Sequence, residues 1–89
     1  MPTVTFTRAL ERFLKAPPAD VEGATLGEAL GAVFASRPAL RGYVLDDQGG
    51  LRRHVAVYVN GKPARDRIRL SDPVGPSDQI YVFQALTGG

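Results

Sequence analysis

Alternation of apolar and polar residues predicts three β-strands in this sequence. In each of three segments every second residue is apolar, which is the pattern of a strand with one buried face. The segments are Thr3 to Thr7, His54 to Val59 and Gln79 to Gln84. The positions expected to face the core are Val4, Phe6, Val55, Val57, Val59, Ile80 and Val82. Asn60-Gly61, directly after the second segment, is a strong signal for a tight turn.

A second pattern, with apolar residues three and four positions apart, predicts one central helix from Thr25 to Arg37. Its apolar stripe consists of Leu26, Ala29, Leu30, Val33 and Phe34. Thr25 and Glu28 form a capping box, in which the Thr25 hydroxyl accepts from the Glu28 N–H and the Glu28 carboxylate reaches back to the Thr25 N–H. Pro38 disfavours a helical conformation at Arg37, so we expect the helix to end there.

The remaining segments carry turn residues or short apolar runs. We expect a short second strand near Asp20 to Glu22, after a loop that contains Pro17-Pro18. A further short strand is expected from Gly42 to Leu45, followed by a turn from Asp46 to Gly50. Lys62 to Leu70 contains a proline and several charges, which is typical of an edge strand.

Together these elements predict an α+β domain in which a mixed sheet packs on one central helix, the arrangement of the β-grasp fold. The chain has 89 residues, of which 44% are hydrophobic, and this is enough for one small core. We expect the domain to span residues 1–84 and a flexible tail to span residues 85–89.

The absence of cysteine and the single histidine, His54, exclude several kinds of chemistry. A disulfide framework, a thiolate nucleophile and a Cys-ligated or His-rich metal site all need residues that the sequence lacks. The acidic residues are scattered, so no metal site is expected. Because the ordinary nucleophile–base pairs are missing, we do not expect an enzyme, and we interpret His54 as structural or exposed.

The net charge is only +2, from 11 basic and 9 acidic residues, and it does not favour nucleic acid as a partner. Arg65, Arg67 and Arg69 would share one face of an extended segment and could bind phosphates there, although a solvated edge is the commoner outcome. No apolar run is long enough to span a membrane, and the first residues do not resemble a signal peptide. We therefore expect a cytoplasmic protein.

The last five residues, from Ala85 to Gly89, suggest a chemical role for the end of the chain. Extended, they reach roughly 16–18 Å, and Gly88 and Gly89 have no side chains that would block a narrow slot in another protein. An α-carboxylate in such a slot can attack the α-phosphate of ATP and form an acyl adenylate. The alternative is a frayed, glycine-rich end without function.

Three motifs together resemble those of the ubiquitin-like sulfur carriers, which include ThiS and the small subunit of molybdopterin synthase. They are the run from Leu51 to Gly61 with its V-x-V-N-G core, the strand from Asp78 to Phe83, and the terminal Gly88-Gly89. The resemblance implies that an ATP-dependent, ubiquitin-activating-like enzyme adenylates Gly89 and that a sulfur donor converts it to a thiocarboxylate. It implies no permanently bound cofactor, because the partner enzyme uses the ATP.

The acceptor of the sulfur stays open at this point. Gly75-Pro76-Ser77-Asp78 replaces the D-G-D that is usual in the family before the last strand, and Gln84-Ala85-Leu86 stands where many relatives have a proline. The run from Leu51 to Asn60 looks most like the carriers that feed sulfide to a cysteine synthase. Molybdopterin, thiamine, tRNA thiolation and secondary-metabolite pathways remain alternatives, as do a protein modifier joined to lysines and a plain interaction module.

Three aromatic residues, Tyr58, Tyr81 and Phe83, occupy the outward positions of their strands. An exposed aromatic cluster beside the root of the tail would suit the activating enzyme or the acceptor synthase as a partner. Coverage of the three rings by other side chains or a loop is the alternative. We expect Arg53, next to Arg52, to lie at the rim of this surface, and the tail residues Leu86 and Thr87 to contact the same partner.

Overall fold

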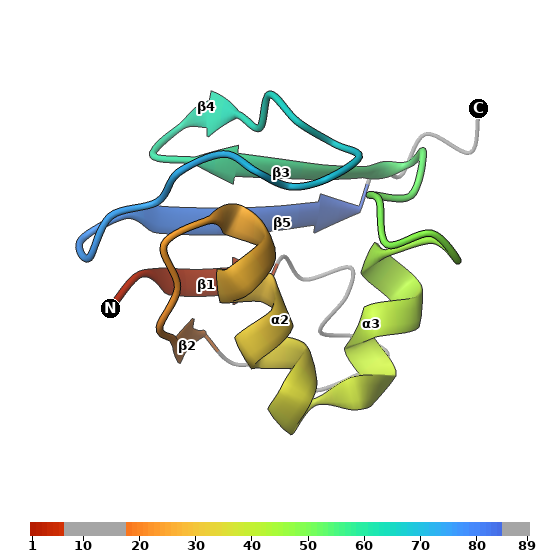
Figure 1. Ribbon diagram of the computed structural model, residues 1–89, viewed down its shortest axis with the longest axis horizontal. Coiled ribbons are helices and arrows are strands. Elements are labelled where there is room, and N and C mark those ends of the chain that lie inside the picture. The colour runs from red at the N-terminus through yellow and green to blue at the C-terminus, as the bar shows by residue number, and fades with distance from the viewer. Residues whose placement is uncertain (7–17, 85–89) are drawn as a thin grey trace.

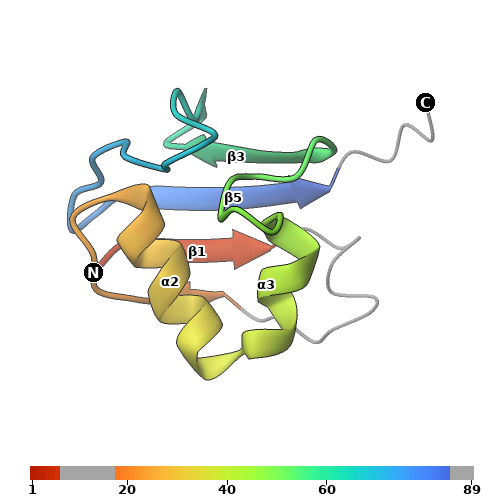
Figure 2. The same ribbon diagram turned by 45° about the vertical axis from the view of Figure 1, so that its right-hand side comes forward.

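The computed structural model describes residues 1–6 and 18–84 of the chain. Within these residues a five-stranded mixed sheet carries two helices on one face (Figure 1). In chain order the elements are β1 Thr3–Phe6, β2 Ala19–Asp20, α2 Leu26–Ser36, α3 Pro38–Val44, β3 Val55–Val59, β4 Lys62–Pro63 and β5 Gln79–Gln84. Figure 2 shows both helices in front of the sheet, so the opposite sheet face is left without a helix in the described part of the chain.

The strand order is β2-β1-β5-β3-β4, which places the last strand of the sequence at the centre of the sheet. β5 runs parallel to β1, with Val4 opposite Ile80, and antiparallel to β3, with Val57 opposite Val82. The three strands expected from alternation are therefore confirmed. The expected strand near Asp20 to Glu22 is also present, but it is displaced toward the N-terminus to Ala19–Asp20.

Helix α2 begins and ends where the sequence indicates, with Thr25 and Arg37 as its caps. The Thr25 hydroxyl accepts from the Glu28 N–H at 3.2 Å, as expected. The second half of the capping box differs, because the Glu28 carboxylate accepts from the Ala24 N–H at 3.0 Å and not from Thr25. The whole apolar stripe of the helix is buried, and it consists of Leu26, Ala29, Leu30, Val33 and Phe34.

The expected strand from Gly42 to Leu45 is wrong, because Gly42 to Val44 form the last turn of a second helix, α3. Arg37 keeps the non-helical conformation that the following proline demands, with φ −135° and ψ 69°. Pro38 then occupies the first turn of α3, where its missing N–H has no intrahelical acceptor to lose. The proline thus separates two helices, and the sheet packs on both of them.

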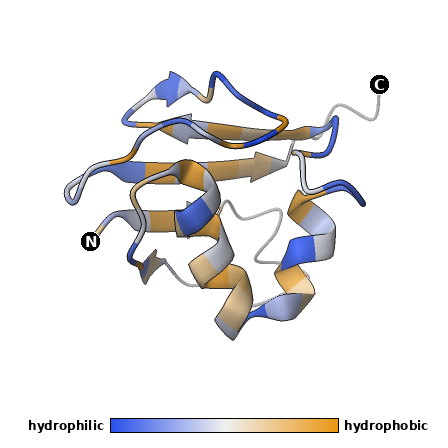
Figure 3. Ribbon diagram, in the orientation of Figure 1, coloured by the Kyte–Doolittle hydropathy of each residue, from blue (hydrophilic) through white to orange (hydrophobic). Residues whose placement is uncertain are grey.

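One apolar core lies between the helices and the sheet, and Figure 3 shows apolar residues along the strands and both helices. Its largest fully buried side chains are Phe6, Leu26, Leu30, Leu40, Ile80, Val4, Val33, Val44, Val55, Val57 and Val82. The core therefore contains every strand position expected to face inward except Val59, which is partly buried and packs against it. No polar or charged side chain is buried within the described ranges.

The expected edge strand from Lys62 to Leu70 is also wrong beyond its first two residues, since β4 ends at Pro63. The chain then forms a turn around Asp66, whose carboxylate accepts from the N–H groups of Ile68 at 3.1 Å and Arg69 at 2.9 Å. A side chain that satisfies backbone donors in this way competes with the sheet ladder. As a result Arg65, Arg67 and Arg69 do not share an extended face.

Candidate partner-binding face and tail root

The aromatic residues expected on the outer face of the sheet lie in contact with one another. Tyr58 and Tyr81 are cross-strand partners in β3 and β5. The rings of Tyr58 and Phe83 stack with centroids 5.4 Å apart and an interplanar angle of 22°. The rings of Tyr81 and Phe83 are tilted by 60° at a centroid distance of 6.4 Å. The three side chains thus form one aromatic cluster across the two central strands, which we call the aromatic face.

The aromatic face points away from both helices, because its residues alternate with the buried positions of β3 and β5. Tyr81 is 38% exposed, whereas Tyr58 and Phe83 are half-buried. The register extends the row to either side, with Pro63 of β4 opposite Tyr58 and Thr5 of β1 opposite Tyr81. Within the described residues the rings cover one another in part, and the face keeps an apolar centre open to solvent.

The tail root is the end of β5, where Gln84 lies opposite Val55, the first residue of β3. Arg53 and His54 come directly before Val55, and both are exposed. Arg53 is therefore at the same end of the sheet as the tail root. Its neighbour Arg52 has a structural role, because its Nε donates to the Gly42 carbonyl at 2.7 Å and so ties the segment before β3 to α3.

Four residues expected to react or to contact a partner lie outside the described residues. They are Leu86, Thr87, Gly88 and Gly89. Their roles stay predictions that rest on the sequence. The structure does fix the strand that precedes them, because β5 is paired on both sides, with β1 and with β3.

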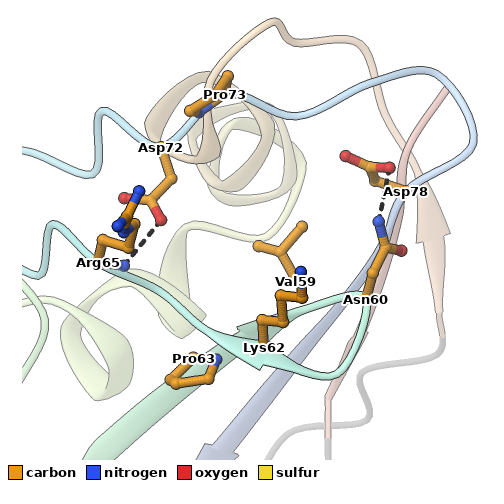
Figure 4. Close-up of a pocket in the computed structure, with 8 residues that line it drawn as sticks. All are labelled: Val59, Asn60, Lys62, Pro63, Arg65, Asp72, Pro73 and Asp78. Carbon is orange, nitrogen blue, oxygen red and sulfur yellow. Dashed lines mark hydrogen bonds between the residues drawn. The ribbon is translucent and has the colours of Figure 1, made fainter.

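An open pocket of about 590 Å³, not expected from the sequence, lies beside the turn that joins β3 to β4 (Figure 4). It lies at the end of the sheet opposite the tail root, where β3 ends and β5 begins. Figure 4 shows that two hydrogen bonds flank it, from the Asn60 side chain to Asp78 and from the Arg65 N–H to Asp72. The N–H of Gly75 and then the Asn60 side chain lower the pKa of Asp78. The carboxylates of Asp72 and Asp78 thus accept hydrogen bonds from within the protein. The Asn60-Gly61 turn is the only feature of the sequence that indicates this pocket.

The described part of the chain offers no group of three His, Cys, Asp or Glu side chains suited to a metal ion. No helix in the described ranges has the length and apolar character that crossing a membrane requires. The features that remain as a candidate site are the aromatic face and the tail root beside it. Both are suited to contact with another protein.

The fold is that of a ubiquitin-like β-grasp protein. It has a mixed sheet with the last strand at its centre, two helices on one face, and an aromatic face beside the tail root. The chain belongs to the ThiS family, whose model matches residues 9–89. The expected β-grasp fold and the resemblance to ubiquitin-like sulfur carriers are both confirmed.

Individual relatives agree with this assignment. Small archaeal modifier protein 1 of Haloferax volcanii is 37% identical over 71 residues, which cover 79% of this chain and 77% of that protein. Its crystal structure is similar with a TM-score of 0.80 at 30% identity, covering 99% of this chain and 98% of that chain. A chain in the BexX/CysO complex of Amycolatopsis orientalis has a TM-score of 0.85 at 23% identity, with 100% of both chains covered. The chain is thus a member of a family of small sulfur carriers and modifiers, which are not themselves catalysts.

Proposed function

We propose that this chain is a sulfur carrier whose C-terminal Gly89 is adenylated by an ATP-dependent, ubiquitin-activating-like enzyme and then converted to a thiocarboxylate. The carboxylate attacks the α-phosphate of ATP and pyrophosphate leaves. A sulfur nucleophile then displaces AMP from the acyl carbon, and the resulting thiocarboxylate donates its sulfur to an acceptor synthase. The chain holds no permanent cofactor in this scheme, because the partner enzyme binds the ATP.

The observation that supports the proposal best is the continuity of β5 with the tail. β5 carries Tyr81 and Phe83 on its outer side, and the same strand leads to the final residues, through which the family model also extends. A partner that binds the aromatic face is therefore beside the tail root. Fully extended, the five tail residues span roughly 16–18 Å, which is the greatest distance at which the active site of the activating enzyme can lie from the tail root.

Arg53 fits this arrangement as a rim residue. It is exposed and lies two residues before Val55, which is opposite Gln84 at the tail root. We propose that Arg53 contacts the partner's surface where the tail enters, together with the tail residues Leu86 and Thr87.

Cysteine biosynthesis is the pathway that we propose first, because the run from Leu51 to Asn60 looks most like the carriers that feed a cysteine synthase. Molybdopterin, thiamine and tRNA thiolation are the alternatives. Incubation of the thiocarboxylated chain with each acceptor synthase of its organism will distinguish them, since only the cognate acceptor should consume the thiocarboxylate.

The experiment that tests the carrier function is a measurement of intact mass. The chain is incubated with its cognate activating enzyme, Mg-ATP and a sulfur source, and a control omits ATP. We expect a mass increase equal to the exchange of one oxygen for one sulfur, found only with ATP. No conversion by any activating enzyme of the same organism would refute the proposal.

A second candidate function is protein modification, favoured by the 37% identity to Small archaeal modifier protein 1. In that case a lysine amine would attack the acyl carbon of the Gly89 adenylate, AMP would leave, and an isopeptide bond would form. Isopeptide-linked conjugates of the chain in a cell extract, identified by peptide mass, would support this function. Their absence alongside thiocarboxylate formation would leave the sulfur carrier alone.

A further inference from the structure

The turn from Asp66 to Arg69 carries an unusual apolar side chain at its tip. Ile68 is 78% exposed, more than any other large apolar side chain in the described part of the molecule. A single exposed apolar residue is common on protein surfaces and needs no function. Here, however, the turn is fixed in place, positively charged and close to the tail root.

Hydrogen bonds to two carboxylates hold the turn. Asp66 accepts from the N–H groups of Ile68, Arg69 and Ser71 and from the Ser71 hydroxyl. Asp72 accepts from the N–H groups of Arg65 at 2.7 Å and Asp66 at 2.8 Å. The backbone beneath Ile68 is therefore ordered before any partner arrives, which lowers the entropic cost of binding at this residue.

The turn is also attached to the start of β3, which pairs with the end of β5 at the tail root. The Arg67 guanidinium donates to the carbonyl of Val55 at 2.6 Å and to that of Arg52 at 2.8 Å. Val55 is opposite Gln84 at the tail root. The Leu51 N–H donates to the Arg67 carbonyl at 2.8 Å, which holds the turn from its other side. The turn thus lies at the same end of the sheet as the tail root.

Charge and shape indicate the chemistry of the partner. Three arginines lie in the segment from Arg65 to Arg69, against one aspartate. Arg69 is exposed, Arg67 donates to the two carbonyls, and Arg65 lines the pocket at the opposite end of the sheet. An open hollow of about 510 Å³ lies beside Ile68 and is lined by Leu51, Gly50 and Asp46 among others. The Asp46 carboxylate accepts from the N–H groups of Gln48 and Gly50. Arg69, next to Ile68 in the chain, suits an acidic group on a partner that places an apolar side chain against Ile68.

We propose that the Asp66–Arg69 turn is a second docking site for the activating enzyme, with Ile68 as its apolar anchor and Arg69 as its contact to an acidic surface of that enzyme. The proposal rests on the proposed carrier function. It is independent of the aromatic face, because it uses a turn after β4 and none of the three rings. The activating enzyme is chosen because every pathway considered for this chain requires its binding.

The test is a titration of the activating enzyme with the chain in the absence of ATP, so that binding is measured whether or not Gly89 reacts. Ile68→Ser and Arg69→Glu are each expected to raise Kd at least about fivefold, as hot-spot residues do. Salt should weaken binding of the unmodified chain more than binding of Arg69→Glu. Melting temperature and circular dichroism check that each variant is folded.

Lys62→Glu is the matched control, because it makes the same charge change on exposed β4 as Arg69→Glu makes on the turn. It should change Kd by less than about twofold. A Kd unchanged by both turn variants would overturn the proposal, and so would an equal effect of Lys62→Glu, which would indicate net charge alone. Weakened binding to the acceptor synthase only would also overturn it. Normal turn-dependent binding without any adenylation would instead refute the carrier function.

Discussion

The side chain of Asn60 connects the turn after β3 to the start of β5 through Asp78. Its Nδ2 donates to the Asp78 carboxylate at 2.8 Å, and its Oδ1 accepts from the Gln79 N–H at 2.9 Å. Asn60 itself has a positive φ of 51°, a conformation that Asn tolerates better than most residues. The V-x-V-N-G and Asp78-Gln79 motifs, far apart in the sequence, therefore meet in one hydrogen-bonded contact.

We predict that Asn60→Ala destabilises the fold more than Asn60→Gly does. Both variants lose the bonds to Asp78 and Gln79, but only alanine also opposes the left-handed backbone, at a cost of about 1 kcal/mol. Urea unfolding of the three proteins measures the difference. Equal loss in the two variants would mean that the backbone conformation contributes nothing, and no loss in either would remove the role of the side chain.

Two glycines of helix α2 provide a matched pair of substitutions. A Cβ at Gly31 would meet no atom within 4 Å, whereas a Cβ at Gly27 would lie 3.3 Å from the Leu70 carbonyl oxygen. Gly31→Ala should therefore stabilise the protein by roughly 0.5–1 kcal/mol through helix propensity. Gly27→Ala should gain less or destabilise, because the turn at Leu70 must shift. Thermal unfolding measures both, and a greater gain at Gly27 would contradict the close approach.

We predict that truncation of a ring on the aromatic face weakens partner binding and leaves folding intact. Truncation of Tyr81 or Phe83 to alanine should weaken the complex with the activating enzyme or the acceptor by about 1 kcal/mol or more. Calorimetric titration against each enzyme measures the effect, and circular dichroism controls for folding. Unchanged affinity of both variants for both enzymes would leave the face without a binding role.

The reacting end of the chain allows the sharpest prediction. Deletion of Gly89 shortens the reach by roughly 3.3–3.6 Å, far beyond the tolerance of about 1 Å for reacting groups. Gly88→Val adds a branched side chain where a narrow slot admits none. Both variants should fold normally and fail to gain sulfur in the intact-mass assay. Conversion of the deletion variant at the rate of the unmodified chain would refute Gly89 as the reacting residue.

Stability should fall in acid because of Asp66. The Ser71 hydroxyl first, and then the N–H of Arg69, lower the pKa of this carboxyl from 3.8 to about 2. A carboxyl with a lowered pKa in the folded state stabilises the fold fully above its unfolded pKa and loses that contribution as pH falls toward the folded value. We expect the melting temperature to drop between about pH 4 and pH 2, and to drop less steeply in Asp66→Asn. Identical pH profiles would contradict this role.

Most of the fold could be predicted from periodicity, because its main strands and α2 bury one face each. Helix α3 could not, since Pro38 was interpreted as a stop signal, although proline is as compatible with the first turn of a helix as it is disruptive further inside. With Gly42 in its last turn, the segment has only Leu40 and Val44 as buried positions. Two apolar residues four apart are too few to establish a helical period.

The candidate site could be predicted only in part, for a related reason. The outward position of Tyr58, Tyr81 and Phe83 follows from strand alternation alone. The role of Arg67 does not, because its donation to Val55 depends on where β4 ends and how the chain turns at Asp66. Such contacts arise from tertiary geometry and leave no local pattern in the sequence.

The central position of β5 has a consequence for synthesis of the protein. A nascent chain that still has residues 79–84 inside the ribosome lacks the strand that joins β1 to β3. The sheet cannot close until residues 79–84 have left the ribosome, because β1 and β3 have no contact in the sheet other than through β5. The decisive step of folding therefore waits for β5, and a chain that lacks this strand has no assembled aromatic face with which to engage an enzyme.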